Sequence, residues 1–142
     1  MSVLLDTHVW VWWLTGESGL SARERNALDR EAAAGQLRVS AISLWEAQML
    51  HAKGRLELPL SFSTWLQRAA DPQMITTLPL DLDVVLALDR LPARFHGDPA
   101  DRLIVATARA RDLPLATYDT AIRRSRAVKL WKPRWSAPSR AT

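Results

Sequence analysis

Cysteine is absent from this chain of 142 residues, and histidine occurs only three times. The lack of cysteine excludes disulfides, zinc–thiolate sites and thiol catalysis. The scarcity of histidine leaves no imidazole-rich ligand set, so a metal ion would have to be bound by carboxylate oxygens. Nothing in the sequence indicates secretion, and we expect a cytoplasmic protein.

Long uninterrupted apolar runs are also absent. The most apolar N-terminal stretch, residues 3–14, contains Asp6 and His8 and has no basic leader, so it fits neither a signal peptide nor a membrane span. With 48% hydrophobic residues, the chain can bury the core of one domain. We place that domain at residues 1–132 and expect residues 133–142 to be a mobile basic tail, because few apolar side chains anchor it.

Positive charge is concentrated in the last third of the chain. Residues 1–100 carry nine basic and twelve acidic side chains, for a net charge of −3, whereas residues 101–142 carry ten and three, for +7. Such a segment attracts polyanions. A solvated basic face with a loose tail is the more common explanation, and charge alone does not distinguish the two.

Short apolar segments alternate with helical patterns. Strands are predicted at residues 2–5, 37–40, 75–78, 115–117 and 128–130, and helices at 7–14, 21–34, 43–53, 62–70, 81–91, 98–111 and 120–124. Capping-box spacing supports two of these helix starts, Ser21 with Glu24 and Ser43 with Glu46. The alternation predicts a three-layer α/β/α fold with a central, mainly parallel sheet of four to five strands.

Acids follow strands or open helices at four places: Asp6, Glu46, Asp101 and Asp119. Because the carboxyl ends of parallel strands share one edge of the sheet, we expect these side chains to gather there. Singly, each is explained as a helix cap, a capping-box partner or a first-turn carboxylate. Together they repel one another unless a cation neutralises them, which favours bound Mg²⁺ or Mn²⁺.

A hard cation at this edge would activate water for attack on a phosphodiester. Three hydroxyl residues near the acids, Thr7, Ser43 and Thr117, are candidates to orient carboxylates or water, although such residues are commonly plain caps and turns. Asp98 is chiefly the N-cap of the helix that carries Asp101, and it is an outer candidate ligand. Arg102 on the same turn is either a phosphate contact or a surface ion-pair partner.

Seven tryptophans are many for a chain of this size. Trp10 and Trp13 share a helical face with Leu14, which favours a core or subunit-interface position, while Trp12 and Trp45 are expected to be partly exposed. Base stacking is the minority explanation for the tryptophans. His8 is expected to be packed or hydrogen-bonded locally.

Four motifs, in order, are similar to those of the PIN-domain family, and most of all to VapC-type toxins of bacterial and archaeal toxin–antitoxin pairs. They are LDTHV at residues 5–9, SLWE at 43–46, HGDPADRLIVATA at 96–108 and LATYD at 115–119. The resemblance implies a Mg²⁺- or Mn²⁺-dependent endoribonuclease that cuts single-stranded or looped RNA, such as transfer RNA, and so inhibits translation and growth. The implied products carry a 3′-hydroxyl and a 5′-phosphate.

The same resemblance assigns roles to particular acids. It implies that Asp6, Glu46 and Asp101 are the core metal-site acids, that Asp119 is the fourth, and that Asp98 is an auxiliary acid. It further implies a homodimer, or a higher toxin–antitoxin assembly, and a VapB-like antitoxin whose C-terminal segment blocks the site.

Two other classes of function remain open. In a non-catalytic α/β module the acids only cap helices and the basic surface binds RNA or a protein. In a receiver-like phosphoacceptor domain an acid ends the middle strand and a lysine lies near the last strand, a position that Lys132 suits. However, the acid that follows residues 75–78 is Asp81, which has the position of a helix cap.

Overall fold

The computed structural model describes residues 2–17, 19–92, 95 and 97–133. In chain order the elements are β1 (Val3–Leu5), α1 (Thr7–Thr15), α2 (Ala22–Ala33), β2 (Leu37–Ser40), α3 (Ala41–Ala52), α4 (Phe62–Ala69), β3 (Thr76–Leu78), α5 (Leu82–Asp89), α6 (Pro99–Arg111), β4 (Leu115–Ala116) and α7 (Thr120–Ser125). The predicted α/β fold is confirmed.

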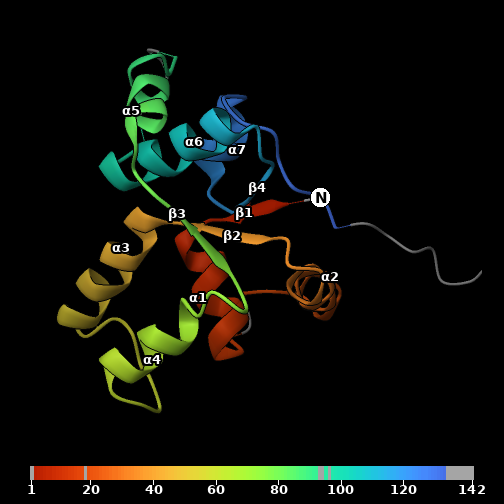
Figure 1. Ribbon diagram of the computed structural model, residues 1–142, viewed down its shortest axis with the longest axis vertical. Helices are drawn as coiled ribbons and strands as arrows, with labels where there is room; N and C mark the ends of the chain where they lie inside the picture. The colour runs from red at the N-terminus through yellow and green to blue at the C-terminus, as the bar shows by residue number, and fades with distance from the viewer. Residues whose placement is uncertain (1, 18, 93–94, 96, 134–142) are drawn as a thin grey trace, which may run out of the picture.

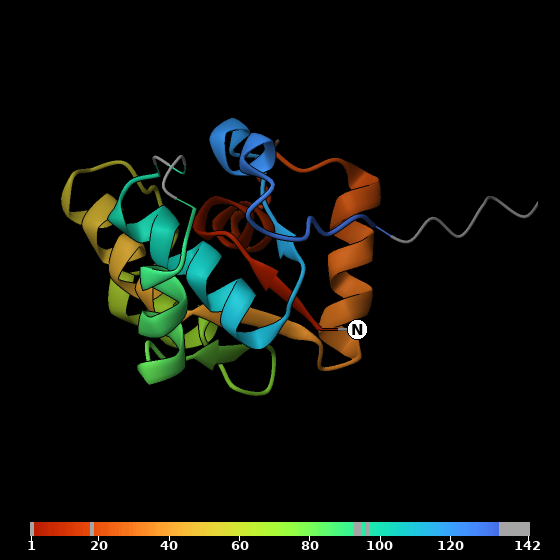
Figure 2. The same ribbon diagram turned by 90° about the horizontal axis from the view of Figure 1, so that it is seen from above.

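The sheet has four strands in the order β3-β2-β1-β4, and every neighbouring pair is parallel. The arrows of β1 and β4 therefore point the same way, toward the starts of α1 and α7 (Figure 2). The strand predicted at residues 128–130 is wrong in extent: Leu130 makes only an isolated parallel bridge with Leu115. All four strands thus deliver their carboxyl ends to one edge of the sheet.

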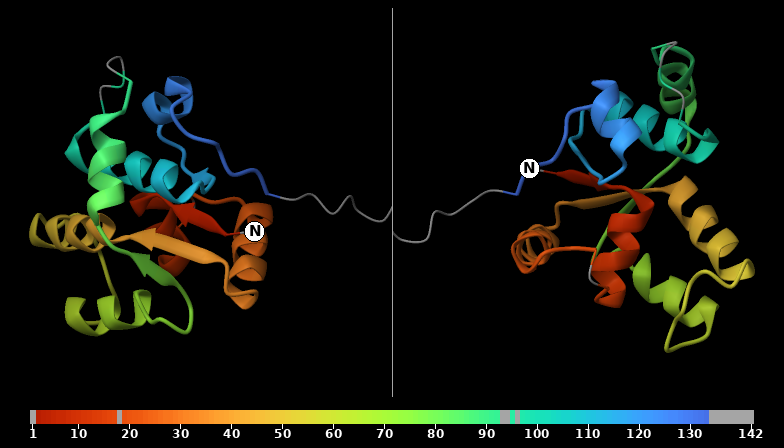
Figure 3. Two further views of the ribbon diagram at one scale, coloured as in Figure 1. Left: turned by 45° about the horizontal axis from the view of Figure 1, so that its top comes forward. Right: turned by 180° about the vertical axis from the view of Figure 1, so that it is seen from behind.

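Helices cover both faces of the sheet. α5, α6 and α7 lie on one side, α1 and α4 on the other, and α2 and α3 at opposite ends (Figures 1 and 3). Alternation along β1 supplies both cores: Val3 and Leu5 pack with α1 and α4, whereas Leu4 packs with α6 and α7. All three side chains are fully buried. Each face of the central strand is therefore covered, as a parallel sheet requires.

Helix α3 begins earlier than its capping-box spacing predicts. Its N-cap is Ser40, the last residue of β2, whose hydroxyl accepts a hydrogen bond from the backbone N–H of Ile42 over 3.2 Å. The predicted Ser43–Glu46 capping box is therefore wrong, because Ser43 already lies inside the helix. The other predicted box, Ser21 with Glu24, is confirmed at the start of α2.

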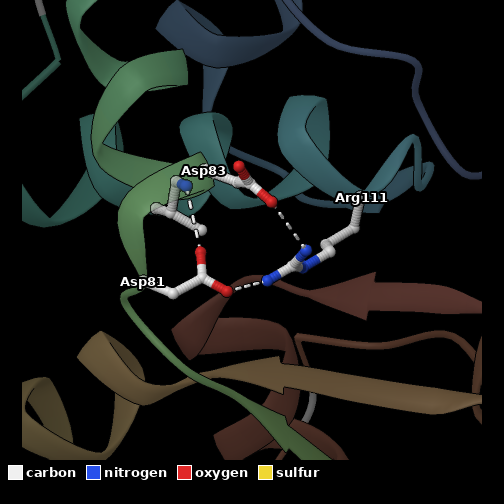
Figure 4. Close-up of polar contacts among 4 residues, drawn as sticks. Asp81, Asp83 and Arg111 are labelled. Atoms are coloured by element: carbon white, nitrogen blue, oxygen red, sulfur yellow. Dashed lines mark hydrogen bonds and ion pairs between the residues drawn. The ribbon is translucent and has the colours of Figure 1, made fainter.

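An ion-pair network joins α5 to the end of α6 (Figure 4). Asp81 caps α5 through one carboxylate oxygen, which accepts from the N–H of Val84 over 3.1 Å, while its other oxygen pairs with Arg111. Arg111 also lies 3.7 Å from a carboxylate oxygen of Asp83. Asp81 is thus a helix cap and an ion-pair partner, which removes the support for a receiver-like domain.

Two further predictions concern the C-terminal tail and membrane-spanning helices. Apart from Pro133, the predicted tail at 133–142 lies outside the described residues. Within the ranges given above, no helix has both the length and the apolar character needed to cross a bilayer.

Candidate active site

Asp6 lies between β1 and α1 and is the N-cap of α1. The side chain is 5% exposed. Oδ1 accepts from the backbone N–H of Thr7 and Oδ2 accepts from the hydroxyl of Thr117, each over 2.7 Å. Both oxygens of this buried carboxylate are therefore held by fixed donors, which sets its orientation.

Thr117 connects Asp6 to the fourth predicted acid. The backbone N–H of Asp119 donates to the Thr117 hydroxyl over 3.1 Å, and that hydroxyl in turn donates to Asp6. Asp119 itself caps α7, with Oδ1 accepting from the N–H of Ile122 over 2.9 Å. Because β1 and β4 are parallel neighbours, the two acids follow adjacent strands at the same sheet edge.

A second hydroxyl pair positions Glu46. Thr7 donates its single hydroxyl proton to Oε1 of Glu46. The Ser43 hydroxyl, 2.8 Å from that of Thr7, must therefore donate to Thr7. Thr7 and Ser43 are both buried, so the bonds form a fixed link between α1 and α3. Ser43 and Glu46 are three residues apart on α3, so both lie on the helix face that meets Thr7.

The first turn of α6 supplies Asp98 and Asp101. Asp98 is the N-cap, and its Oδ1 accepts from the backbone N–H of Asp101 over 2.7 Å. Gly97 lets the preceding loop pass close by, since a Cβ there would lie 2.8 Å from the ring of Phe95 and 3.0 Å from Cβ of Asp101. The cap and the close loop fix where Asp101 enters the cluster.

The electrostatics show that these acids share one environment. Burial raises the pKa of Asp101 to about 7, and the nearby charges of Asp98, Asp6, Asp119 and Glu46 add to the effect. Burial is likewise the main cause that raises the pKa of Asp6 and of Glu46, against hydrogen bonds from Thr117 and Thr7 that lower it. Asp6, Glu46, Asp98 and Asp119 thus lie near enough to Asp101 to affect its pKa, and the five acids come from four segments of the chain.

Arg102 and the two histidines near the acids have less direct connections to the cluster. Arg102 donates from Nη1 to the backbone carbonyl of Phe95 over 3.0 Å, so it ties down the loop before α6. His96, from the same loop, lies outside the described residues. His8 is exposed and lies near enough to Asp6 and Glu46 to lower their pKa slightly against the larger effect of burial.

A divalent cation suits this donor set by chemistry. Burial and the neighbouring acids raise the pKa of Asp6, Glu46 and Asp101, and none of the ion pairs among the described side chains includes these three. Carboxylate oxygens without cysteine or clustered imidazole are the ligands of Mg²⁺ and Mn²⁺. As arranged, however, no group of three or more acidic or histidine side chains in the described part of the chain is placed to hold a metal ion. Mg²⁺ usually keeps several waters and needs only one or two protein carboxylates.

The family that this fold and site define is confirmed by the sequence itself. Residues 3–127 match the model of the PIN domain, and the chain belongs to the PIN-domain family. It is 36% identical over 133 residues to "Ribonuclease VapC22" of Mycobacterium tuberculosis, covering 92% of this chain and 98% of that protein. The predicted similarity to VapC-type proteins is therefore confirmed.

Solved structures of proteins with low sequence identity share the fold. A VapBC2 complex from Rickettsia felis bound to a promoter DNA fragment matches with a TM-score of 0.70 at 18% identity, over 92% of this chain and 98% of that chain. FitAcB from Neisseria gonorrhoeae matches with a TM-score of 0.63 at 23% identity, over 92% and 97%. At these identities the likeness establishes the architecture.

Proposed function

We propose that this protein is a Mg²⁺- or Mn²⁺-dependent endoribonuclease and the toxin of a toxin–antitoxin pair. The observation that carries the proposal is the meeting of Asp6, Glu46, Asp101 and Asp119 at one sheet edge, with Asp98 beside them, in a PIN-domain chain. The 36% identity to a curated ribonuclease supports the substrate class.

The chain's own residues would hold the metal and orient the reactants. When bound, the cation would lower the pKa of a water and stabilise charge on the leaving oxygen. Asp6, Glu46 and Asp101 are the proposed ligands, with Asp119 as the fourth acid and Asp98 outside them. Thr117 and Thr7 keep the carboxylates of Asp6 and Glu46 in place through hydrogen bonds. Cleavage that leaves a 3′-hydroxyl and a 5′-phosphate breaks the bond between phosphorus and O3′.

We further propose that the protein acts in the cytoplasm, with a VapB-like antitoxin as its partner. The structural neighbours VapBC and FitAB are complexes of two components, which supports such a partner here. A homodimer is supported by an apolar stripe on α5, where Leu82, Val85 and Leu86 are 72%, 50% and 42% exposed. Light scattering of the purified chain, with and without Leu82→Asp, tests the dimer.

Cleavage assays test the enzymatic proposal. The parent should cut single-stranded or looped RNA, such as transfer RNA, only with Mg²⁺ or Mn²⁺, and EDTA should abolish the reaction. Asp6→Asn and Asp101→Asn should each reduce kcat by on the order of 100-fold or more, since each removes a charge that holds the metal. Asp89→Asn, which alters an exposed acid at the end of α5, is the matched control.

The outcomes separate the enzyme from a non-catalytic module. If the two site variants cut RNA as fast as the parent, the metal mechanism is wrong. A parent that binds RNA or protein but cleaves nothing with any divalent ion would favour the module in which the acids only cap helices. Induction in a bacterium should arrest growth for the parent and for Asp89→Asn, but not for Asp101→Asn.

A further inference from the structure

Three aromatic side chains form a row beside the acids. Trp12 neighbours both His8 and Tyr118, with ring centroids 5.9 Å from each and interplanar angles of 50° and 42°. His8 and Trp12 are four residues apart on α1 and therefore share a helical face. Tyr118 reaches the same place from the end of β4. We call His8, Trp12 and Tyr118 the aromatic shelf.

The backbone places this shelf at the acid cluster. His8 follows Thr7, which bonds Glu46, and His8 is close enough to influence the charges of Asp6 and Glu46. Tyr118 stands between Thr117, which bonds Asp6, and the acid Asp119. Since β1 and β4 are parallel neighbours, the segments that follow them begin at the same edge of the sheet (Figure 2). One segment, α1, carries His8 and Trp12, and the other carries Tyr118.

Within the shelf, the Trp12 ring is packed against the protein, whereas Tyr118 and His8 are exposed to solvent. Trp12 is half-buried, and a Cβ at Gly19 would overlap its indole, so the loop before α2 closes tightly over that ring. Tyr118 remains 40% exposed and His8 is exposed. A ring that only filled the core would be covered, as Trp10 is at 0%. The outward rings are therefore available to a ligand with a flat face.

A cationic side chain lies next to Tyr118. Nη1 of Arg123, on α7, donates to the backbone carbonyl of Thr117 over 2.9 Å, and the rest of this exposed side chain is free to reach solvent. Tyr118, Arg123 and Lys132 also line a hollow of about 130 Å³, together with Glu24. Glu24 is already bonded to the N–H of Ser21 in its capping box. An aromatic face beside two cations suits a base and its phosphate.

We propose that Tyr118, backed by Trp12, stacks against an unpaired base of single-stranded RNA next to the cut phosphate, while Arg123 contacts a neighbouring phosphate. This inference rests on the proposed ribonuclease function and adds a positioning site to it. Stacking accepts any base, because each has a π-face, so the shelf selects unpaired over duplex RNA and not one sequence over another. Duplex RNA keeps its bases inside the helix and cannot use the shelf.

Binding by an inactive variant tests the stacking. In an Asp101→Asn background with Mg²⁺, affinity for a short single-stranded RNA should fall about 5- to 100-fold in Tyr118→Ala. Tyr118→Phe should bind as the parent does, and Tyr118→Leu should bind nearly as weakly as the alanine variant, because leucine keeps apolar area but has no π-face. Equal binding by the phenylalanine and leucine variants would overturn stacking. Affinity for duplex RNA should not change.

The salt dependence of RNA binding tests the proposed contact between Arg123 and a phosphate. Arg123→Gln keeps a donor for the Thr117 carbonyl but loses the charge, so the slope of log affinity against log salt should shrink by about 0.7–1. Arg68→Gln, on α4 across the sheet, removes the same charge elsewhere and should leave the slope at its parental value. Equal slopes for Arg123→Gln and the parent would overturn this contact.

Kinetics separate failure of the shelf from failure of the enzyme. In the active background, Tyr118→Ala should raise KM far more than it lowers kcat, since the base is bound before the bond breaks. A parent that cuts RNA while Tyr118→Ala keeps parental KM and affinity overturns only the shelf. A parent that cuts no RNA overturns the proposed function. If Tyr118→Ala weakens binding of the antitoxin and leaves RNA binding unchanged, the shelf docks protein and the proposal is wrong.

Discussion

The hydroxyl of Thr117 holds the carboxylate of Asp6 across two neighbouring strand ends, with Oγ1 donating to Oδ2 over 2.7 Å. The bond favours the charged form of a carboxylate whose pKa is raised by burial. It therefore keeps Asp6 available as a ligand, although the residues are 111 positions apart in the chain.

Thr117→Val should weaken metal binding and cleavage with little change in fold. Valine replaces the hydroxyl by a methyl group of similar size, so Asp6 stays buried but loses a donor, and the N–H of Asp119 loses its acceptor. Loss of such an outer partner reduces metal affinity or activity by about 10- to 100-fold. Calorimetric titration with Mn²⁺ and a cleavage assay would measure it. Thr117→Ser should restore most of both, and parental affinity in the valine variant would show that the bond plays no part.

Thr7 and Ser43 should be energetically coupled. Thr7→Val removes the donor to Glu46 and leaves the buried Ser43 hydroxyl without its acceptor, which should cost about 1.5–3 kcal/mol of unfolding free energy. Ser43→Ala should cost about 1 kcal/mol. In the double variant the loss should be smaller than the sum by about 0.5 kcal/mol or more. Urea unfolding of the four proteins measures this, and strict additivity would contradict the shared network.

The stability of the metal-free protein should depend on Asp101. Its pKa is about 7 in the folded chain and about 3.9 when unfolded. Between these values the folded state binds more protons, so stability is greatest below pH 4 for this group and decreases as pH rises through 7. Asp6 and Glu46, whose pKa values are also raised, act in the same direction.

Asp101→Asn should therefore stabilise the metal-free protein at pH 8. After screening by solvent we expect about 1–2 kcal/mol, or a rise in Tm of about 2–6 °C. The gain should shrink at pH 5, where the parent is already protonated, and Mg²⁺ should raise the Tm of the parent but hardly that of the variant. Thermal unfolding by circular dichroism would decide, with Asp89→Asn as control. A variant less stable than the parent at pH 8 would contradict carboxylate repulsion.

Asp81 should matter more to stability than Asp83, although both face Arg111. Asp81→Ala removes a helix cap and an ion pair, which should cost about 1–2 kcal/mol. Asp83→Ala loses only a 3.7 Å pair made by a side chain that is 68% exposed, worth about 0.5 kcal/mol or less. Asp81→Asn keeps an N-cap and should fall between them. If Asp81→Ala and Asp83→Ala lowered the unfolding free energy equally in denaturant, the cap would contribute nothing.

Much of the fold follows from local patterns. The strands at residues 3–5 and 37–40, the capping box of Ser21 with Glu24, and the Asp98 cap before Pro99 all form where the pattern predicts them. The start of α3 was not predictable in this way, because Ser40 and Ser43 both suit an N-cap. Ser40 is the N-cap because β2 ends there and its hydroxyl accepts a hydrogen bond from the N–H of Ile42. The roles of the acids in metal binding and catalysis stay predictions.

The sequence by itself determined the alternation of strands and helices, the placement of Asp6, Asp101 and Asp119 at element ends and the PIN-domain motifs, because these depend on residues close together in the chain. Glu46, predicted at a helix start, lies inside α3. Tertiary structure decided which hydroxyl holds which acid, how strongly burial raises the pKa of Asp101, and that His8, Trp12 and Tyr118 meet. Those relationships join α1, α3, α6 and the end of β4. They depend on how separate elements pack, and the spacing of residues along a chain does not specify such contacts.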